Sequence, residues 1–293
     1  MSVVSSRSSS SVLRGQVVLL LGTMASDKTT ELLCQGRRFA IAGKRVCLIK
    51  YDDGRTSKHF SDLPVSFSNC LDDDTDAAAA AAAAVAGEQV LSRSGATGRA
   101  TLAIRSLAPL LNGTLPHLRE YDVFLLDEAH FFSPWELRAL VLCCRRLLNK
   151  PLFMTALHST FKLQPWATVS WILPLCTDIR YHTAVCSRVF NVTGTEEVCG
   201  DEATLPFRLD GGVQSTVDVG GDEKYQSRCM RCYDDGIREQ QQRNGAQPPC
   251  AMDVLLASAR DEYAEYLSGT FCWEIPGVEL SAPATTVPPT VPT

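Results

Sequence analysis

The chain has 293 residues, of which 45% are hydrophobic and 21% charged, and its formal net charge is −5. This length is enough for one large domain or two small ones with a buried core. The acidic balance and the lack of a basic cluster argue against nucleic-acid binding. No apolar run reaches the roughly 18 residues that a membrane span needs. The 12 cysteines are irregularly spaced and follow no secretory signal, which predicts reduced thiols in an intracellular, cytoplasmic protein.

Residues 1–14 are rich in serine, with two arginines and no acid. We expect a disordered N-terminal tail here, and a transit peptide is the alternative. An apolar run over 17–21 then ends at Gly22 and leads through a short loop into Lys28 and Thr29, where helical spacing begins. This is the strand–loop–helix plan of a phosphate-binding P-loop, whose pattern is G-x-x-x-x-G-K-[ST].

Asp27 occupies the place of the second glycine in that pattern. Aspartate tolerates left-handed backbone geometry, but its carboxylate next to a triphosphate costs roughly 1 to 4 kcal/mol in repulsion. We still expect the loop and the helix N-terminus to bind phosphates, with Lys28 against the outer ones and the Thr29 hydroxyl on Mg²⁺. The predicted phosphate-binding residues of ATP are Gly22, Thr23, Met24, Ala25, Ser26, Asp27, Lys28, Thr29 and Thr30. An ordinary strand–helix turn that contains a lysine is the alternative.

The strand before the loop and the residues after it together predict a β-α-β unit. Apolar spacing predicts a helix over 29–42 with Gly43 as its stop, and a short buried strand over 46–49 follows. Residues from about 66 to 118, which contain eight consecutive alanines at 77–84, have a different composition. We interpret them as a low-complexity insertion without chemistry.

Order returns with a buried strand over 123–126, a helix over 133–148 that has Ser133 as its N-cap, and a strand over 152–157. Residues 171–185 are expected to supply a further strand and a turn. The predicted fold class is therefore α/β, a P-loop NTPase-like and mainly parallel sheet over 15–180.

Two acids, Asp127 and Glu128, close the strand over 123–126. A P-loop needs a carboxylate at the end of a neighbouring strand to position Mg²⁺, often beside a group that handles the proton. We predict that Asp127 binds Mg²⁺ together with Thr29; two acids that merely cap the next helix are the alternative. Asp-Glu-Ala-His at 127–130 is also a helicase signature, but the residues after it are too few and too acidic for a helicase.

A second group of residues suggests a metal site. Cys229 and Cys232 form a C-x-x-C pair, which is half of a tetrahedral zinc site. Cys186 begins another pair, but Val189 stands where its mate belongs. The predicted metal ligands are thus Cys186, Cys229 and Cys232, with Cys199 or His182 as candidates for a fourth; unligated thiols are the alternative.

In their order and spacing these motifs resemble the type II, cytosolic-type thymidine kinases. The resemblance runs from Gly15 to about Tyr233 and includes Ile49-Lys50-Tyr51, Phe131-Phe132, Ala156-Leu157, Thr160-Phe161, Thr183 to Cys186, Gly220-Gly221 and Lys224-Tyr225. It implies transfer of the γ-phosphate of ATP to the 5′-hydroxyl of thymidine or deoxyuridine with Mg²⁺, and a homo-oligomer, commonly a tetramer.

The resemblance also implies roles for single residues. Glu128 aligns with the catalytic base. The aligned nucleoside-binding residues are Met24, Phe131, Leu157, Phe161 and Trp166, together with Val217, Val219, Gly220 and Tyr225 on a lasso loop. The resemblance implies a small lasso and zinc-ribbon-like subdomain over 181–235, and we expect 236–293 to be an extension that is disordered from about 282.

The departures from the family pattern are concentrated at the predicted site. Asp27 replaces a glycine, Ala25 an aromatic residue, and Val189 a zinc cysteine, while Ala129-His130 replaces Gly-Gln and His158-Ser159 replaces Asp-Gly. Because function resides in the site and not in the fold, a second hypothesis is a catalytically silent relative that binds a partner or pairs with an active subunit.

Overall fold

The computed structural model describes residues 14–52, 89–91, 97–99, 102–113, 118–192, 194–210, 224–245 and 252–267. The chain divides after Cys250 into two units, and each is described by itself. Within the described ranges, no helix combines the length and the apolar character needed to cross a membrane.

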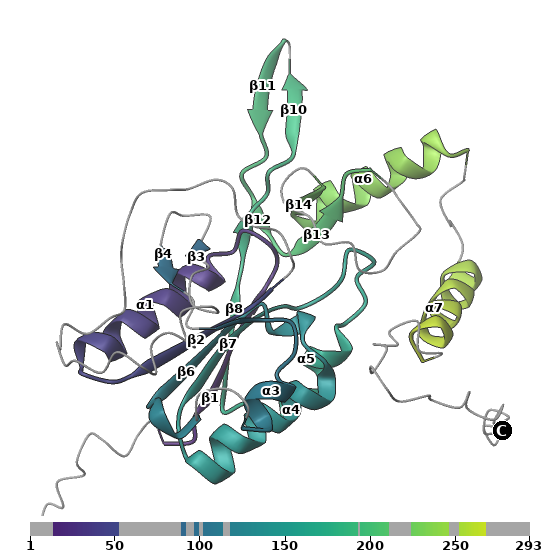
Figure 1. The fold of residues 1–293 in the computed structure, drawn as a ribbon. Coiled ribbons are helices and arrows are strands. Elements are labelled where there is room, and N and C mark those ends of the chain that lie inside the picture. The colour runs from purple at the N-terminus through teal and green to yellow at the C-terminus, as the bar shows by residue number, and fades with distance from the viewer. Residues whose placement is uncertain are drawn as a thin grey trace, which may run out of the picture. The chain divides into compact units, whose positions relative to one another are not determined.

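The first unit is built on a six-stranded sheet (Figure 1). Every pairing in this sheet is parallel, so the carboxyl ends of all strands lie along one edge. This confirms the predicted α/β fold class. The spatial order of the strands is β5 (Leu102–Ile104), β2 (Val46–Tyr51), β6 (Val123–Asp127), β7 (Leu152–Leu157), β1 (Val17–Gly22) and β8 (Asp178–His182).

Helices cover both faces of this sheet (Figure 1). On one face, Leu32 and Leu33 of α1 (Lys28–Ile41) share a core with alternate strand residues such as Val18, Leu20 and Leu125. The other face carries α3 (Ala108–Leu111), α4 (Pro134–Leu142) and α5 (Ala167–Ile172). Burial on both faces explains why the strands read as nearly continuous apolar runs.

Most predicted elements appear close to their expected bounds. Helix α1 is followed by Gly43 with φ 72, as expected of a C-terminal stop. Helix α4 continues as the π-helical segment η4 (Cys143–Leu148). Ser133 occupies the N-cap position of α4, yet its hydroxyl makes no capping bond. The strand expected over 171–185 starts only at Asp178, because α5 and the 3₁₀ turn η5 (Leu173–Leu175) precede it.

The range predicted for the insertion, 66–118, is too long at its C-terminal end, because residues from Leu102 onward belong to the main domain. Strand β5 is an edge strand of the main sheet, and Leu107 and Leu110 are buried. The buried Glu136 of α4 accepts hydrogen bonds from Ser106 Oγ (2.6 Å) and from the Leu107 backbone N–H (3.0 Å), which ties the segment to the domain. Before it come a small hairpin of β3 (Gln89–Leu91) and β4 (Thr97–Arg99), and after it the 3₁₀ turn η2 (Leu118–Glu120). The alanine run lies outside the described residues.

Three antiparallel strand pairs follow the sheet in the same unit. They are β9 (Ala184–Val185) with β12 (Glu202–Ala203), β10 (Val189–Val192) with β11 (Thr195–Val198), and β13 (Leu205–Arg208) with β14 (Tyr225–Arg228). The hairpin of β10 and β11 projects from this region (Figure 1).

The predicted domain boundary at 235/236 falls inside helix α6 (Met230–Arg243). Gly236 packs so closely that an added Cβ would lie 2.2 Å from Arg228 Nη1. The subdomain therefore continues through α6. The second unit contains α7 (Met252–Leu267). The expected N-terminal tail, apart from Arg14, and the expected disordered end from 282 lie outside the described residues.

Candidate active site

Strand β1 delivers the phosphate loop to the carboxyl edge of the sheet. A Cβ on Gly22 would lie 2.2 Å from the His182 carbonyl oxygen, so only glycine fits beside β8. The loop then turns through left-handed backbone at Ala25 (φ 55) and Asp27 (φ 57). Side-chain-bearing residues in this region store strain of order 1 kcal/mol each, a feature that is common at functional sites.

Asp27 keeps the backbone conformation for which the P-loop pattern uses glycine. Its carboxylate Oδ1 accepts a hydrogen bond of 3.3 Å from Thr30 Oγ1, and its carbonyl oxygen accepts one of 3.0 Å from the Glu31 N–H. The aspartate thus serves the first turn of α1. What remains unusual is its negative charge next to the loop.

Lys28 is buried at the start of α1, and its ammonium group lies within the loop. Nζ donates to Ser26 Oγ at 2.9 Å and to the Thr23 carbonyl oxygen. Ser26 Oγ itself donates to the Thr23 carbonyl oxygen at 2.8 Å. These bonds hold a positive charge inside the curve of the loop, where an anionic ligand would neutralise it.

The acidic strand end meets the phosphate loop directly. Thr29 Oγ1 donates to Asp127 Oδ1 at 3.1 Å, and Thr155 Oγ1 of β7 donates to the same oxygen at 2.6 Å. Burial raises the pKa of Asp127, and the hydrogen bonds from Thr155 and Thr29 and the charge of Lys28 offset only part of that rise. The two predicted magnesium ligands, Thr29 and Asp127, are therefore neighbours.

Glu128 follows in left-handed backbone (φ 55), and its N–H donates to Thr155 Oγ1 at 2.9 Å. Thr155, which the sequence analysis missed, therefore contacts both acids of the pair. The Glu128 side chain makes no capping bond to η3 (Ala129–Phe131). Helix capping thus does not account for this acid, and strained backbone at a strand end is typical of a catalytic position.

Four of the predicted nucleoside-binding residues are aromatic, and their rings contact one another in two pairs. Phe131 and Trp166 lie 6.0 Å apart between ring centroids, and Phe161 and Tyr225 lie 6.1 Å apart. Tyr51, for which no site role was predicted, packs against Phe131 in a tilted arrangement with ring centroids 5.3 Å apart. Of the other predicted nucleoside-binding residues, Leu157 ends β7 level with Gly22, and Met24 lies in the phosphate loop. Val217, Val219 and Gly220 lie outside the described residues.

His130 is buried and packs against two of these rings, with centroid distances of 4.1 Å to Phe131 and 4.9 Å to Trp166. Its Nδ1 accepts a hydrogen bond of 3.3 Å from the Leu157 N–H, so the neutral ring carries its proton on Nε2. Burial, with a smaller contribution from the charge of Lys28, lowers the pKa of His130 to about 3. The ring is therefore neutral near pH 7.

This pKa predicts a pH-dependent stability. The unfolded chain binds a proton on this histidine near pH 6.5, whereas the folded chain binds it only near pH 3. The contribution of His130 to the free energy of unfolding should therefore fall below pH 6.5 by up to about 1.4 kcal/mol per pH unit, and His130→Gln should remove this contribution. Urea unfolding of both proteins at pH 7.5 and pH 5 measures the difference, because the contributions of Asp127 and of His158 and His182, whose pKa values burial also lowers, are common to both. Equal pH dependence in the two proteins would contradict the prediction.

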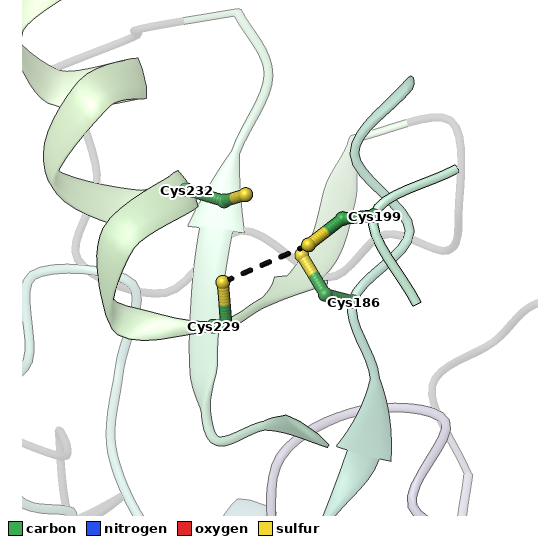
Figure 2. Close-up of side chains that lie close together, drawn as sticks. All are labelled: Cys186, Cys199, Cys229 and Cys232. Carbon is green, nitrogen blue, oxygen red and sulfur yellow. Dashed lines mark hydrogen bonds between the residues drawn. The ribbon is translucent and has the colours of Figure 1, made fainter. Parts of the chain in front are cut away.

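Four cysteine side chains form a cluster in the region of the paired strands. The sulfur atoms of Cys186, Cys199, Cys229 and Cys232 all lie within 4.8 Å of one another, and Figure 2 shows them pointing toward one another. The Sγ atoms of Cys199 and Cys229 are 3.9 Å apart. A zinc ion with bonds of about 2.3 Å separates its sulfur ligands by about 3.8 Å, so the donor set fits tetrahedral Zn²⁺.

The hairpin of β10 and β11 explains how Cys199 reaches this cluster. Val189 pairs with Val198, and Cys199 comes next, where its N–H donates to the Arg188 carbonyl oxygen at 2.9 Å. The hairpin is thus inserted where a C-x-x-C pair would have its second cysteine. His182, the other candidate, instead ends β8 level with Gly22 and does not belong to the cluster.

The cluster shifts the pKa values of two of its thiols in opposite directions. Burial raises the pKa of Cys186, but hydrogen bonds from the backbone of Arg188 and Cys229 and from neighbouring thiols bring it below its ordinary value. Burial and the adjacent thiols raise the pKa of Cys232. The thiolate is the form that binds metal.

One family of known proteins matches the chain. The family model described as thymidine kinase matches residues 79–233, more than half of the 293 residues. The cytosolic thymidine kinase of Bos taurus is 29% identical over 224 residues, which cover 75% of this chain and 72% of the relative. The cytosolic thymidine kinase of Homo sapiens is 29% identical over 223 residues, covering 75% and 74%. The thymidine kinase of Monkeypox virus (strain Zaire-96-I-16) is 26% identical over 224 residues, covering 75% and 98%.

Proposed function

Because this chain belongs to the thymidine kinase family, we propose that it transfers the γ-phosphate of ATP to the 5′-hydroxyl of thymidine or deoxyuridine. The observation that carries the proposal is the 3.1 Å hydrogen bond between Thr29 Oγ1 and Asp127 Oδ1. It joins the phosphate loop to the acidic strand end, so an ammonium, a hydroxyl and a carboxylate pair are available at one edge of the sheet. These are the groups that phosphoryl transfer requires.

The donor atoms at this edge suit Mg²⁺. A hydroxyl and a carboxylate oxygen are hard ligands, and Thr29 and Asp127 present them 3.1 Å apart. Thr155 orients the carboxylate of Asp127 through its 2.6 Å hydrogen bond. When bound, Mg²⁺ would neutralise charge on the phosphates, and the other steps fall to side chains of the chain itself.

In the proposed mechanism Lys28 and the N–H groups of residues 22–30 bind and orient the phosphates. Glu128 accepts the proton of the 5′-hydroxyl while the hydroxyl oxygen attacks the γ-phosphorus. The bond from that phosphorus to the oxygen bridging to the β-phosphate breaks, and ADP leaves with the electron pair. Most of the acceleration comes from positioning and charge neutralisation.

The aromatic side chains supply the proposed nucleoside site. Phe131, Trp166 and Phe161 would contact the base, with Met24 and Leu157 completing the apolar wall. Tyr225, whose ring lies 6.1 Å from that of Phe161, would close the site with the lasso residues Val217, Val219 and Gly220. By the same family membership we propose a homo-oligomer, commonly a tetramer, that acts in the cytoplasm.

We also propose a structural Zn²⁺ ion held by Cys186, Cys199, Cys229 and Cys232. Its contribution would be to fix the paired strands from which the lasso departs, because structural zinc sites contribute folding free energy. The proposal rests on the donor set, four sulfur atoms within 4.8 Å of one another.

The direct test of the kinase is ATP-dependent formation of thymidine monophosphate by the purified full chain. A second proposal is a catalytically silent member that binds a partner, and the acidic Asp27 in the phosphate loop favours it. One experiment that combines calorimetric titration with a product assay distinguishes the active kinase from the silent relative. Binding of Mg²⁺-ATP and thymidine without product at high protein concentration would favour the silent protein, and product would exclude it.

We expect Asp27→Gly to tighten Mg²⁺-ATP binding by about tenfold or more. The change removes a negative charge near the phosphates, and glycine adopts the φ of 57 without strain. Calorimetric titration measures the affinity. Asp27→Asn is the matched control, because asparagine removes the charge and keeps a side chain of the same shape. If neither variant binds more tightly, charge at this position is not the limiting feature.

A further inference from the structure

Two side chains next to the Cys229–Cys232 pair reach the two halves of the candidate active site. Ser227 of β14 lies two residues before Cys229, and its Oγ donates to the Met24 carbonyl oxygen of the phosphate loop at 2.5 Å. Tyr233, directly after Cys232, donates from its hydroxyl to the Phe161 carbonyl oxygen at 3.1 Å. No role was predicted for either residue from the sequence pattern.

Ser227 lies between the phosphate loop and the cluster. It is buried, and its hydroxyl also lies 3.4 Å from Thr23 Oγ1. Its carbonyl oxygen accepts a hydrogen bond of 3.1 Å from the N–H of Ser187, the residue after Cys186. The Thr23 carbonyl oxygen accepts a hydrogen bond from the Lys28 ammonium, so Lys28 and Ser227 together hold the segment of Thr23 and Met24.

Tyr233 is held in place by packing, and it contacts the loop that carries the predicted nucleoside-binding residue Phe161. Its ring is buried and meets Phe207 edge-on at 5.7 Å, within a small core that also contains Leu205. The residue that it holds, Phe161, lies against Tyr225 at 6.1 Å and under the Arg208 guanidinium at 5.1 Å. The loop between β7 and α5, which carries Phe161, is therefore tied to the first turn of α6.

We propose that Ser227 and Tyr233 are positioning residues through which the four-cysteine cluster holds the phosphate loop and the nucleoside loop in register. The inference rests on the proposed function, in which the first loop binds ATP and the second binds thymidine. In-line transfer depends on the alignment of the two substrates, and misplacement by about 1 Å costs as much as 100-fold in rate. Because Cys229 and Cys232 belong to one cluster, a zinc ion bound there would couple the two ties.

The first test needs no ligand: it measures amide hydrogen exchange in the full chain. Ser227→Ala should raise exchange in residues 22–30 by about threefold or more and leave residues 158–166 unchanged, and Tyr233→Phe should do the reverse. Ser187→Ala and Tyr263→Phe are matched controls, because Ser187 Oγ makes one long hydrogen bond within the described residues, of 3.5 Å to the Ser227 carbonyl oxygen, and Tyr263 is exposed in the second unit. Removal of bound zinc with a chelator should raise exchange in both loops. Unchanged exchange in both variants, or an equal rise in both loops for each, would overturn the proposal.

The second test separates this inference from the proposed function. In titrations, Ser227→Ala should raise the Kd for Mg²⁺-ATP by about threefold to tenfold and leave the Kd for thymidine unchanged. Tyr233→Phe should raise the Kd for thymidine and leave that for Mg²⁺-ATP unchanged. A protein that binds neither ligand would refute the proposed function, while the exchange data would still decide whether the two ties exist. A variant that weakens both ligands equally would show general destabilisation and count against the proposal.

Discussion

Glu128→Gln should reduce the kcat for thymidine monophosphate formation by about 10²- to 10⁴-fold, the usual contribution of a general base. The amide cannot accept the proton of the attacking hydroxyl, whereas its size and hydrogen-bonding reach resemble those of the carboxylate. Glutamine also has to adopt the φ of 55 found at this position, at a cost similar to that of glutamate. Steady-state kinetics with varied ATP and thymidine measure the loss.

The KM for ATP should change little in this variant, because Lys28 and Thr29 remain in place. Glu120→Gln, a substitution of an exposed residue on the 3₁₀ turn before β6, is a matched control and should leave kcat unchanged. If Glu128→Gln turned over at the wild-type rate, another group would have to remove the proton. A fall in ATP affinity without a fall in kcat would assign Glu128 to binding.

Cys199→Ser should lower the zinc content of the purified protein from about one equivalent to less than about half an equivalent. The four sulfur atoms lie within 4.8 Å of one another, so the serine removes one of the four ligands of a closed site. Structural zinc in small peptides contributes about 10 to 16 kcal/mol of binding free energy, so the paired strands and α6 should lose order with the metal. Elemental analysis and thermal unfolding measure the two effects.

A rescue experiment makes this prediction specific to the hairpin. Val189→Cys restores the family spacing, yet it should not recover zinc in the Cys199→Ser protein, because Val189 pairs with Val198 inside β10. Cys34→Ser is the matched control, since Cys34 is an exposed thiol on α1. A full equivalent of zinc in Cys199→Ser, or less than half an equivalent in the wild type, would contradict the assignment.

The fold of the phosphate loop could be predicted because its signals are local. An apolar strand that ends at Gly22 and a helix that begins near Lys28 follow from residue spacing, and the structure places β1 and α1 within about one residue of those bounds. The edge strand β5 could not be predicted in the same way. It has three residues, and it becomes a strand because β2 offers an unpaired edge and Glu136 holds the following turn.

In the candidate site, too, some features follow from neighbouring residues and others from the tertiary structure. The sequence by itself determined the α/β class and which acids and which lysine end strands or begin helices, since these depend on neighbours within a few residues. Only the tertiary structure decided that Thr29 meets Asp127 and that Cys199, not His182, completes the cluster. It also brought Ser227 to Met24. The physical reason is that side-chain spacing in space depends on strand order and hairpin closure, and distance along the chain records neither.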